Sequence, residues 1–443
     1  MPLPDALRVL VRTLGAAILA AWVTSACDLA GGSTQTATTS AAPSPTITAR
    51  ALAPPPAAGD VKALLEEIAP EVQRLRGLAG WSVPVELVGR DRLKTLLTEA
   101  IQQDYPQEEA EIDRLQLELL GLLPAGSDLR ALRMDLLEEQ VIGFYDSKKQ
   151  EMFAVGDAAT PDAMLRFVLA HEYIHALQDR AFDLDKLEEA LSGNDDATAA
   201  LGALVEGDAT LAGLQYSALN IDQQALADAA PGEGDGGLDR TPRILREALM
   251  FPYDYGTRFV GALVSEEGWD AVDDAFSRLP ASTEQIIHPE KYQTGEAPME
   301  VTLPELSRAL PDGWREARRS VAGEFFIRVM LEGCDGLTSA AESAAGWGGD
   351  AYAVYLDPAR RGLFVWVTRW DSEADLTQFW DALAAYFAPC GLGAGDAVAA
   401  ERSLEWSGAG RWVRALRLAD SVVFVAGQSA ESVQAAVAAL SRP

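Results

Sequence analysis

The stretch AHEYIHALQD at residues 170–179 contains two of the three histidines of the chain, four residues apart, with a glutamate directly after the first. In a helix, residues i and i+4 lie on one face, so His171 and His175 can direct their imidazole nitrogens to one point. A tetrahedral zinc ion requires this geometry of two of its ligands, and Glu172 can reach a water on such an ion as general base. The pattern therefore predicts one Zn²⁺ ion and hydrolytic chemistry.

A catalytic zinc ion also needs a third protein ligand and keeps one position for water. No further histidine follows His175 closely, so a carboxylate is expected. Glu206, in ALVEGDAT, is the best candidate, and Asp208 is either a rival ligand or a residue that orients a ligand. Small residues near Glu206 would let its helix approach the first one closely; they are Gly202, Ala203, Ala209 and Gly213.

Three predicted elements position these residues. Thr160 and Pro161 favour a helix start, and the apolar spacing of MLRFVLAHEYIHALQDR predicts a helix with the two histidines in its middle. A second helix, predicted over 198–218, carries Glu206. Before them, VIGFYD and EMFAV flank a polar SKKQ turn and predict a hairpin at 141–155. This hairpin could pair with an extended substrate or be purely structural.

The segments HEYIHALQD and VEGDA together resemble the glutamate zincins, of which thermolysin is the best-known type. They are most similar to uncharacterised exported prokaryotic proteins that also carry an HPEKY segment, found here at 288–292. The zincin resemblance covers residues 141–215, and a broader similarity covers much of 60–440. It implies a zinc metallopeptidase acting on peptides or proteins. The residues it implies are the ligands His171, His175 and Glu206 and the base Glu172.

Within this resemblance, Asp179 lies four residues after His175 on the same helix face. It could accept a hydrogen bond from the free ring N–H of a ligand, a contact that fixes an imidazole. The chain departs from thermolysin in its longer spacing to Glu206 and in Thr210, which stands where thermolysin has an aspartate.

The third histidine, His288, ends the predicted helix STEQIIH before Pro289. A helix C-terminus favours a charged imidazolium, which could donate to an oxyanion that develops during catalysis. A simple capping or surface role is the alternative. Tyr253, Tyr255 and Tyr292 are weaker candidates for the same role, because an aromatic residue in a helical segment is by default part of the core.

The whole chain has 443 residues, 48% of them hydrophobic, and a formal net charge of −31. This composition is typical of a soluble globular protein. The negative charge argues against nucleic-acid partners and against electrostatic docking on anionic lipid.

Residues 1–27 have the pattern of a signal peptide, with an apolar run that ends in the lipobox-like sequence TSAC. Lipidation of Cys27 is predicted, with simple secretion after cleavage nearby as the alternative. We expect an exported protein of the cell envelope, held on the outer side of the cytoplasmic membrane by its lipid anchor only. Residues 28–59, rich in Gly, Ser, Thr, Ala and Pro, predict a disordered tether.

The predicted fold class is α+β. Residues 60–338 form a mostly helical zincin-like domain with the short hairpin, and 346–443 form a small module of two ββα units. The first unit is AYAVYL, LFVWVTRW and SEADLTQFWDALAAYF, and RWVRALRL, SVVFVAGQ and SAESVQAAVAAL repeat its order. A helix is expected over 318–332. Cys334 and Cys390 could form a disulfide or remain two free thiols.

The competing hypothesis is a non-catalytic envelope lipoprotein that acts as a binding module. Its zinc site would be structural or vestigial, with Asp208 or His288 as a fourth ligand. A third hypothesis keeps the hydrolytic chemistry but directs it to an amide bond of cell-wall peptide. The sequence predicts no oligomeric state.

Overall fold

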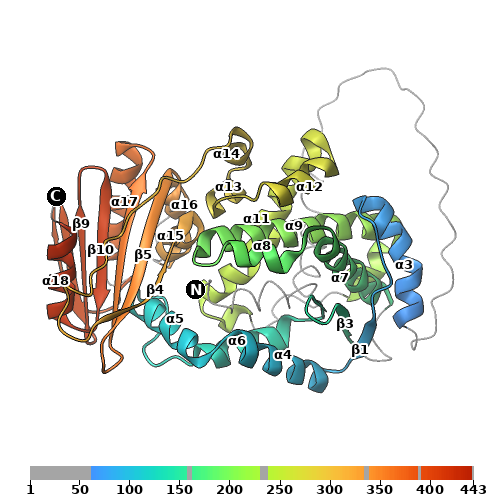
Figure 1. Cartoon of the computed structure of the whole chain (residues 1–443), viewed down its shortest axis with the longest axis horizontal. Helices are drawn as coiled ribbons and strands as arrows, with labels where there is room; N and C mark the ends of the chain where they lie inside the picture. The colour runs from blue at the N-terminus through green and yellow to red at the C-terminus, as the bar shows by residue number, and fades with distance from the viewer. Residues whose placement is uncertain (1–60, 157–161, 230–237, 334–338, 388–390, 442–443) are drawn as a thin grey trace.

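A computed structural model gives the fold of the chain (Figure 1). The predicted signal peptide with Cys27, the tether, Thr160 and Pro161, and the pair Cys334 and Cys390 lie outside the described residues. The described residues are 61–156, 162–229, 238–333, 339–387 and 391–441.

The fold class is α+β, as the sequence predicts. A mainly helical region comes first, and a large antiparallel sheet follows at the other end of the long axis in Figure 1. The helices of the first region are α3 (Val61–Arg76), α4 (Arg90–Asp104), α5 (Gln107–Leu119), α6 (Leu129–Gln140), α7 (Asp162–Phe182), α8 (Leu184–Ala190), α9 (Asp195–Asn220), α10 (Gln223–Ala229), the 3-10 turn η1 (Leu238–Arg240), α11 (Arg243–Glu267), α12 (Trp269–Ser277), α13 (Thr283–Ile287) and α14 (Pro289–Thr294).

A small sheet accompanies these helices. The predicted hairpin forms from β2 (Gly143–Asp146) and β3 (Glu151–Val155), and β1 (Val85–Val88) pairs in parallel with β3. The strand order is β1-β3-β2, so β2 is an edge strand. Both β2 and β3 are largely buried and pack against α7, which explains their apolar sequences.

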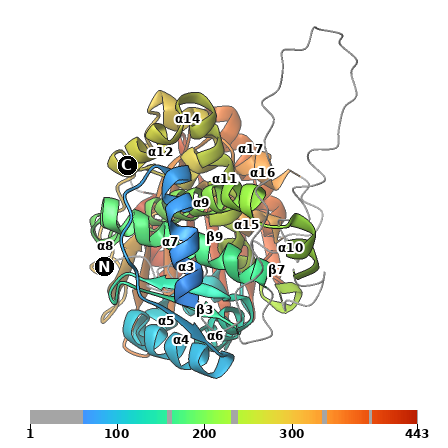
Figure 2. The same cartoon turned by 90° about the vertical axis from the view of Figure 1, so that its right-hand side faces the viewer.

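Helix α7 is buried on all sides along its central turns, from Phe167 to Gln178. Helices α3 and α9 pack against it, and α3 lies in front of both in Figure 2. A helix that is apolar all round must be enclosed in this way, because any exposed face would leave apolar surface in water. The predicted motif helix is therefore the central helix of the first region.

The second region is a seven-stranded antiparallel sheet in the order β4-β5-β6-β10-β9-β8-β7. The two predicted ββα units are β5-β6-α17 and β9-β10-α18, and they join where β6 pairs with β10. The elements of this region are β4 (Arg315–Ser320), α15 (Gly323–Glu332), α16 (Ala340–Ala344), β5 (Trp347–Leu356), β6 (Gly362–Trp370), α17 (Glu373–Tyr386), β7 (Asp396–Ala400), β8 (Ser403–Gly408), β9 (Arg411–Arg417), β10 (Ser421–Gly427) and α18 (Ala430–Leu440).

Three strands were not expected from the sequence. The helix predicted over 318–332 begins only at Gly323, and the residues before it form β4, which pairs with β5. Strands β7 and β8 extend the sheet on its other side. Strand β4 ends at Ser320, and Gly323 has a φ of +81°, a left-handed conformation that a right-handed helix does not continue through, so the helix cannot extend back past it. The sheet thus begins before residue 346.

The two regions share one core. Leu115 and Leu119 of α5 are buried in the same apolar cluster as Trp366 and Phe424 of the sheet. The hydroxyl of Tyr386 on α17 also donates to the Leu120 carbonyl, at 2.6 Å. Within the part of the chain that the structure describes, none of the helices has both the length and the apolar character needed to cross a membrane.

Candidate metal centre

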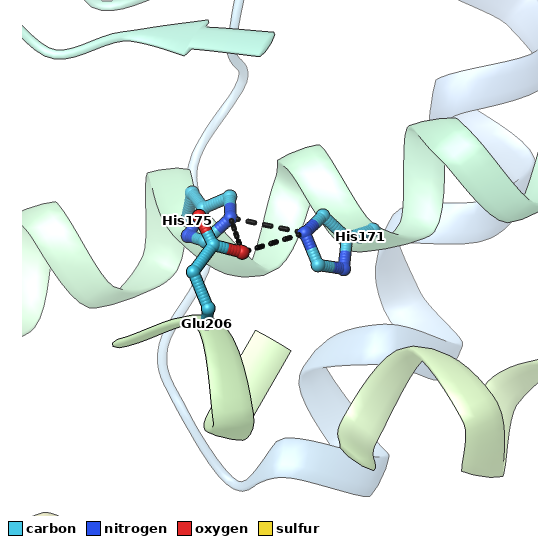
Figure 3. Close-up of side chains that lie close together, drawn as sticks. All are labelled: His171, His175 and Glu206. Carbon is cyan, nitrogen blue, oxygen red and sulfur yellow. Dashed lines mark hydrogen bonds and ion pairs between the residues drawn. The ribbon is translucent and has the colours of Figure 1, made fainter. Parts of the chain in front are cut away.

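Two histidines and one glutamate meet between helices α7 and α9 (Figure 3). The Nε2 atoms of His171 and His175 lie 3.1 Å apart. Glu206 Oε2 lies 3.3 Å from His171 Nε2 and 3.4 Å from His175 Nε2. All three side chains are buried. The structure thus brings the three predicted ligands together in a group that could hold a metal ion.

The spacing of the three atoms fits a tetrahedral ion. Ligand atoms about 2.0–2.1 Å from a tetrahedral zinc are about 3.3–3.4 Å from one another, close to the observed 3.1–3.4 Å. Two imidazole nitrogens argue against Mg²⁺ and Ca²⁺, which favour oxygen ligands, and suit zinc and similar transition metals. Three protein ligands are also the usual number in catalytic zinc sites, whereas structural sites supply four.

A neighbouring amide fixes the tautomer of His175. Gln178 donates its amide nitrogen to the Val205 carbonyl and to Asp208, each at 2.9 Å, so its oxygen is left to accept from His175 Nδ1 at 2.8 Å. With an ion bound, His175 would therefore carry its proton on Nδ1 and offer the Nε2 lone pair to the ion. Asp179 was predicted as a residue that could accept from a ligand's ring N–H, and for His175 this contact is made by Gln178.

Asp208 does not contact the ligands directly. Its Oδ1 accepts from Arg76 Nε at 2.6 Å, and its Oδ2 accepts from the amide of Gln178. Of the two roles predicted for Asp208, these contacts correspond to orienting a ligand, and it acts on His175 through Gln178.

Glu172 lies beside the ligands with only 1% of its surface exposed. Neither of its carboxylate oxygens has a side-chain hydrogen-bond partner among the described residues, and the backbone of Tyr145 on β2 is its polar neighbour. Burial raises the pKa of Glu172 to about 8; the charge of His175 opposes this shift and that of Glu206 adds to it. A divalent cation between the ligands would favour the ionised form. The site therefore contains a carboxyl group that can take up or release a proton next to the metal position.

Strand β2 runs directly past this carboxyl group. A Cβ atom at Gly143 would stand 2.4 Å from Val168 Cγ1 and 3.3 Å from Glu172 Cγ, so the absence of a side chain at Gly143 lets the strand lie this close to α7. Tyr145 donates its hydroxyl to Asp179 Oδ2 at 2.9 Å, which ties β2 to α7. Asp179 thus anchors the strand.

Helix α11 completes the wall beside Glu206. Tyr253 is buried and forms a hydrogen bond with Glu206; burial and the charges of Glu206 and Glu172 raise the pKa of the Tyr253 phenol. The helices approach closely because a Cβ at Gly207 would stand 2.2 Å from the backbone of Gly256. Of the tyrosines considered from the sequence, Tyr253 is the one that contacts a ligand. Tyr255 bonds to Arg328, and Tyr292 donates to the Arg278 carbonyl.

His288 has a different environment. Its Nε2 lies 3.0 Å from Glu324 Oε1 on α15, and the charge of Glu324 raises the pKa of the imidazole. It sits at the junction of α13 and α14, and α13 packs on α9 near Asp196. Asp196 is ten residues before Glu206, roughly 15 Å along the helix. The structure therefore pairs His288 with a carboxylate and does not bring it to the ligands.

A second acidic group, Glu284, Glu296 and Asp371, also has oxygens close enough to hold an ion. The ammonium of Lys291 lies 2.7 Å from the first two residues and 2.8 Å from the third. A lysine already supplies the positive charge there, so this group is an ion-pair cluster. Together with His288, it gives the HPEKY segment a structural role between α13 and the sheet.

Two residues around the ligands were not identified from the sequence. Gln178 carries a signal that could have been used, since it lies three residues after His175 on the same helix face. Arg76 carries none, because it is 132 positions from Asp208 and only the folded chain brings them together.

Residues 308–437 match the family described as Domain of unknown function (DUF8575). The matched segment begins just before β4 and covers all the strands of the large sheet, so the candidate metal site lies outside it. No curated protein and no solved structure matches the chain.

Proposed function

We propose that this protein is an exported zinc metallopeptidase that hydrolyses peptide bonds. The observation that carries the proposal is the buried group of two imidazoles and one carboxylate with the buried Glu172 carboxyl beside it, which has no side-chain hydrogen-bond partner among the described residues. The three-ligand set and the adjacent carboxyl group resemble the site of the glutamate zincins. His171, His175 and Glu206 would hold the ion.

A bound zinc ion would supply an acidified water and polarise the carbonyl of the substrate. Glu172 would accept a proton from the attacking water and deliver it to the leaving amine. Its buried position suits both steps, because burial favours the protonated carboxyl while the nearby ion favours the carboxylate. Tyr253, hydrogen-bonded to Glu206, would keep that ligand in place.

Strand β2 supports an extended peptide as substrate. It is an edge strand of its sheet, and Gly143 brings it against Glu172. An edge strand has backbone groups on one side that a peptide can pair with, which would place a scissile bond beside the metal.

The contacts of two residues weigh against a structural zinc site. A closed site would need a fourth protein ligand, and Asp208 and His288 were the candidates. Both oxygens of Asp208 are used by Arg76 and Gln178, and His288 is paired with Glu324. The peptidase therefore remains the better-supported function.

The test is to incubate the purified, zinc-loaded chain from residue 28 onward with a diverse peptide mixture and to identify products by mass spectrometry. The matched control is Glu172→Gln, which preserves the shape of the side chain but cannot take up the proton. We expect cleavage by the wild type and none by the variant, with zinc bound to both. Cleavage by both proteins would contradict the role of Glu172. Zinc binding without cleavage by either would favour the structural site or a non-peptide amide substrate.

A further inference from the structure

A continuous chain of hydrogen bonds leads away from the metal ligand His175. It runs from His175 Nδ1 to Gln178 at 2.8 Å, and from Gln178 to Asp208 at 2.9 Å. Arg76 then donates from Nε to Asp208 and from an amino nitrogen to Asp273, both at 2.6 Å. These hydrogen bonds join four helices, α7, α9, α3 and α12.

Arg76 is an unusual end for such a chain, because its side chain is 0% exposed. A buried guanidinium is costly unless it is paired, and the Arg76 guanidinium lies between two carboxylates. Its central carbon, Cζ, is also 4.8 Å from the ring centre of Trp269. The hydrogen bonds of Arg76 go to Asp208 and Asp273, not to His171, His175 or Glu206. Its contacts do, however, determine where Asp208 can point.

The orientation of Asp208 matters because Gln178 has two possible orientations. With Asp208 held by Arg76, the amide nitrogen of Gln178 faces the carboxyl oxygen, which accepts from it, since the oxygen of Gln178 would be repelled there. The oxygen of Gln178 then faces His175, and the proton of the imidazole stays on Nδ1. The Val205 carbonyl also accepts from the amide nitrogen of Gln178, at 2.9 Å, and would favour the same orientation. If Asp208 turned away, only that carbonyl would hold the amide, so Gln178 could reverse more easily and place an N–H against His175, which would move the imidazole proton to the metal side.

We propose that Arg76 is a positioning residue for the metal site, which holds His175 in its metal-binding tautomer through Asp208 and Gln178. The inference rests on the proposed zinc site. It adds that helix α3, far from the motif in sequence, determines how tightly the ion binds. Losses of about 10- to 100-fold in metal affinity are typical when such outer contacts of a histidine ligand are removed.

The experiment measures the zinc affinity of the chain from residue 28 onward by competition with a chromophoric chelator. Arg76→Met should bind zinc about 10- to 100-fold more weakly than the wild type. Arg76→Lys, which keeps the charge and can still donate to Asp208, should recover part of this loss. The absorption spectrum of the Co²⁺-loaded protein should change in Arg76→Met, because it reports the geometry of the ligands directly.

The matched control is Arg133→Met. Arg133 is another buried arginine, 3.4 Å from Asp113 and without a link to the metal ligands, so its loss should leave zinc affinity within about twofold. The other end of this series of hydrogen bonds is tested with Gln178→Leu. The losses of zinc affinity in Gln178→Leu and Arg76→Met should not add in the double variant, since either change breaks the same connection. Asp208→Asn serves the same purpose if Arg76→Met does not fold.

A folded Arg76→Met protein with wild-type zinc affinity would overturn the role of Arg76 and leave the proposed peptidase intact. Equal losses in Arg76→Met and Arg133→Met would also overturn it, since they would reflect general destabilisation. A wild-type protein that binds no zinc would contradict both proposals. Zinc binding with the expected losses but without peptide cleavage would support Arg76 and count against the peptidase.

Discussion

At the scale of single residues, Glu206 makes it possible to bury two histidines side by side. Burial alone lowers the pKa of an imidazole, but the charge of Glu206 outweighs it and raises the pKa of His175 to about 9. Burial opposes ionisation of Glu206 as well, yet the two histidines lower its pKa to about 2. In the metal-free protein, a proton shared between these groups therefore takes the place of the ion.

This arrangement predicts how the stability of metal-free protein depends on pH. His175 has a folded pKa of about 9 against an ordinary value of 6.5, so its contribution is full below 6.5 and is lost as the pH rises through 9. Glu172, raised from 4.5 to about 8, acts in the same direction. Urea unfolding after chelation should show a fall on the order of 5 kcal/mol in the free energy of unfolding between pH 6.5 and 9.

Two comparisons test the origin of that fall. Glu172→Gln should reduce it, because the glutamine does not titrate. Zinc-saturated protein should not show it, because the ion replaces the proton. Below pH 4.5 the sign reverses, since Glu206 is lowered from 4.5 to about 2 and its contribution disappears as the pH falls through that range. A metal-free protein that becomes more stable from pH 6.5 to 9 would contradict this account.

The sequence identified the residues whose geometry is local. Helical spacing alone predicted His171, Glu172 and His175. The apolar and small residues around Glu206 predicted that this glutamate could approach them. The contact to His175 was misassigned because Asp179 and Gln178 both lie near that face of the helix. Only the tertiary partners, Tyr145 for Asp179 and Asp208 for Gln178, decide between them.

At the scale of elements, the distance between α9 and α11 depends on two glycines. A Cβ at Gly256 would stand 2.1 Å from the Ala203 carbonyl oxygen, and one at Gly207 would meet Gly256. The small residues noted around Glu206 therefore serve two neighbours: Ala203 faces α11, whereas a Cβ at Gly213 would stand 3.9 Å from His171 on α7.

Gly256→Ala should force these helices apart. We expect the free energy of unfolding to fall by about 1–3 kcal/mol, because the obstacle is backbone and cannot rotate away. Zinc affinity should fall too, since Glu206 and Tyr253 lie on the two helices. Gly261→Ala on the same helix is the control, as its Cβ would meet nothing within 4 Å and alanine should stabilise the helix by up to about 1 kcal/mol. Chemical denaturation measures both; equal effects would exclude the packing explanation.

The elements were predicted well where apolar segments are long or alternate with polar residues. The helices α7 and α9 are long apolar segments, and the hairpin strands flank a polar turn. Strand β4, with the sequence REARRS, has too few apolar residues to show the alternation that is typical of a strand. Its arginines are satisfied by distant partners such as Asp113, which pairs with Arg318, and no local pattern reveals such a pairing.

At the scale of the whole molecule, the shared core predicts one cooperative unfolding unit. Leu115 of α5 packs against Gly362 of β6 and is buried with the sheet residues. Calorimetry should therefore show a single transition in which both regions unfold together. Leu115→Ala should lower the free energy of that transition by about 2–5 kcal/mol and not split it. Two separate transitions in the wild type would show that the regions fold independently.

The buried arginine of α3 also bears on the order in which the chain can fold. Arg76 comes near the start of the described chain, but its partners follow 132 and 197 residues later. Contacts of such high sequence separation form slowly, because a long loop must close before they contribute. Until α9 and α12 have been synthesised and docked, the guanidinium has neither carboxylate and helix α3 cannot be buried. Completion of the metal site should therefore be a late event in folding, after most of the first region is already assembled.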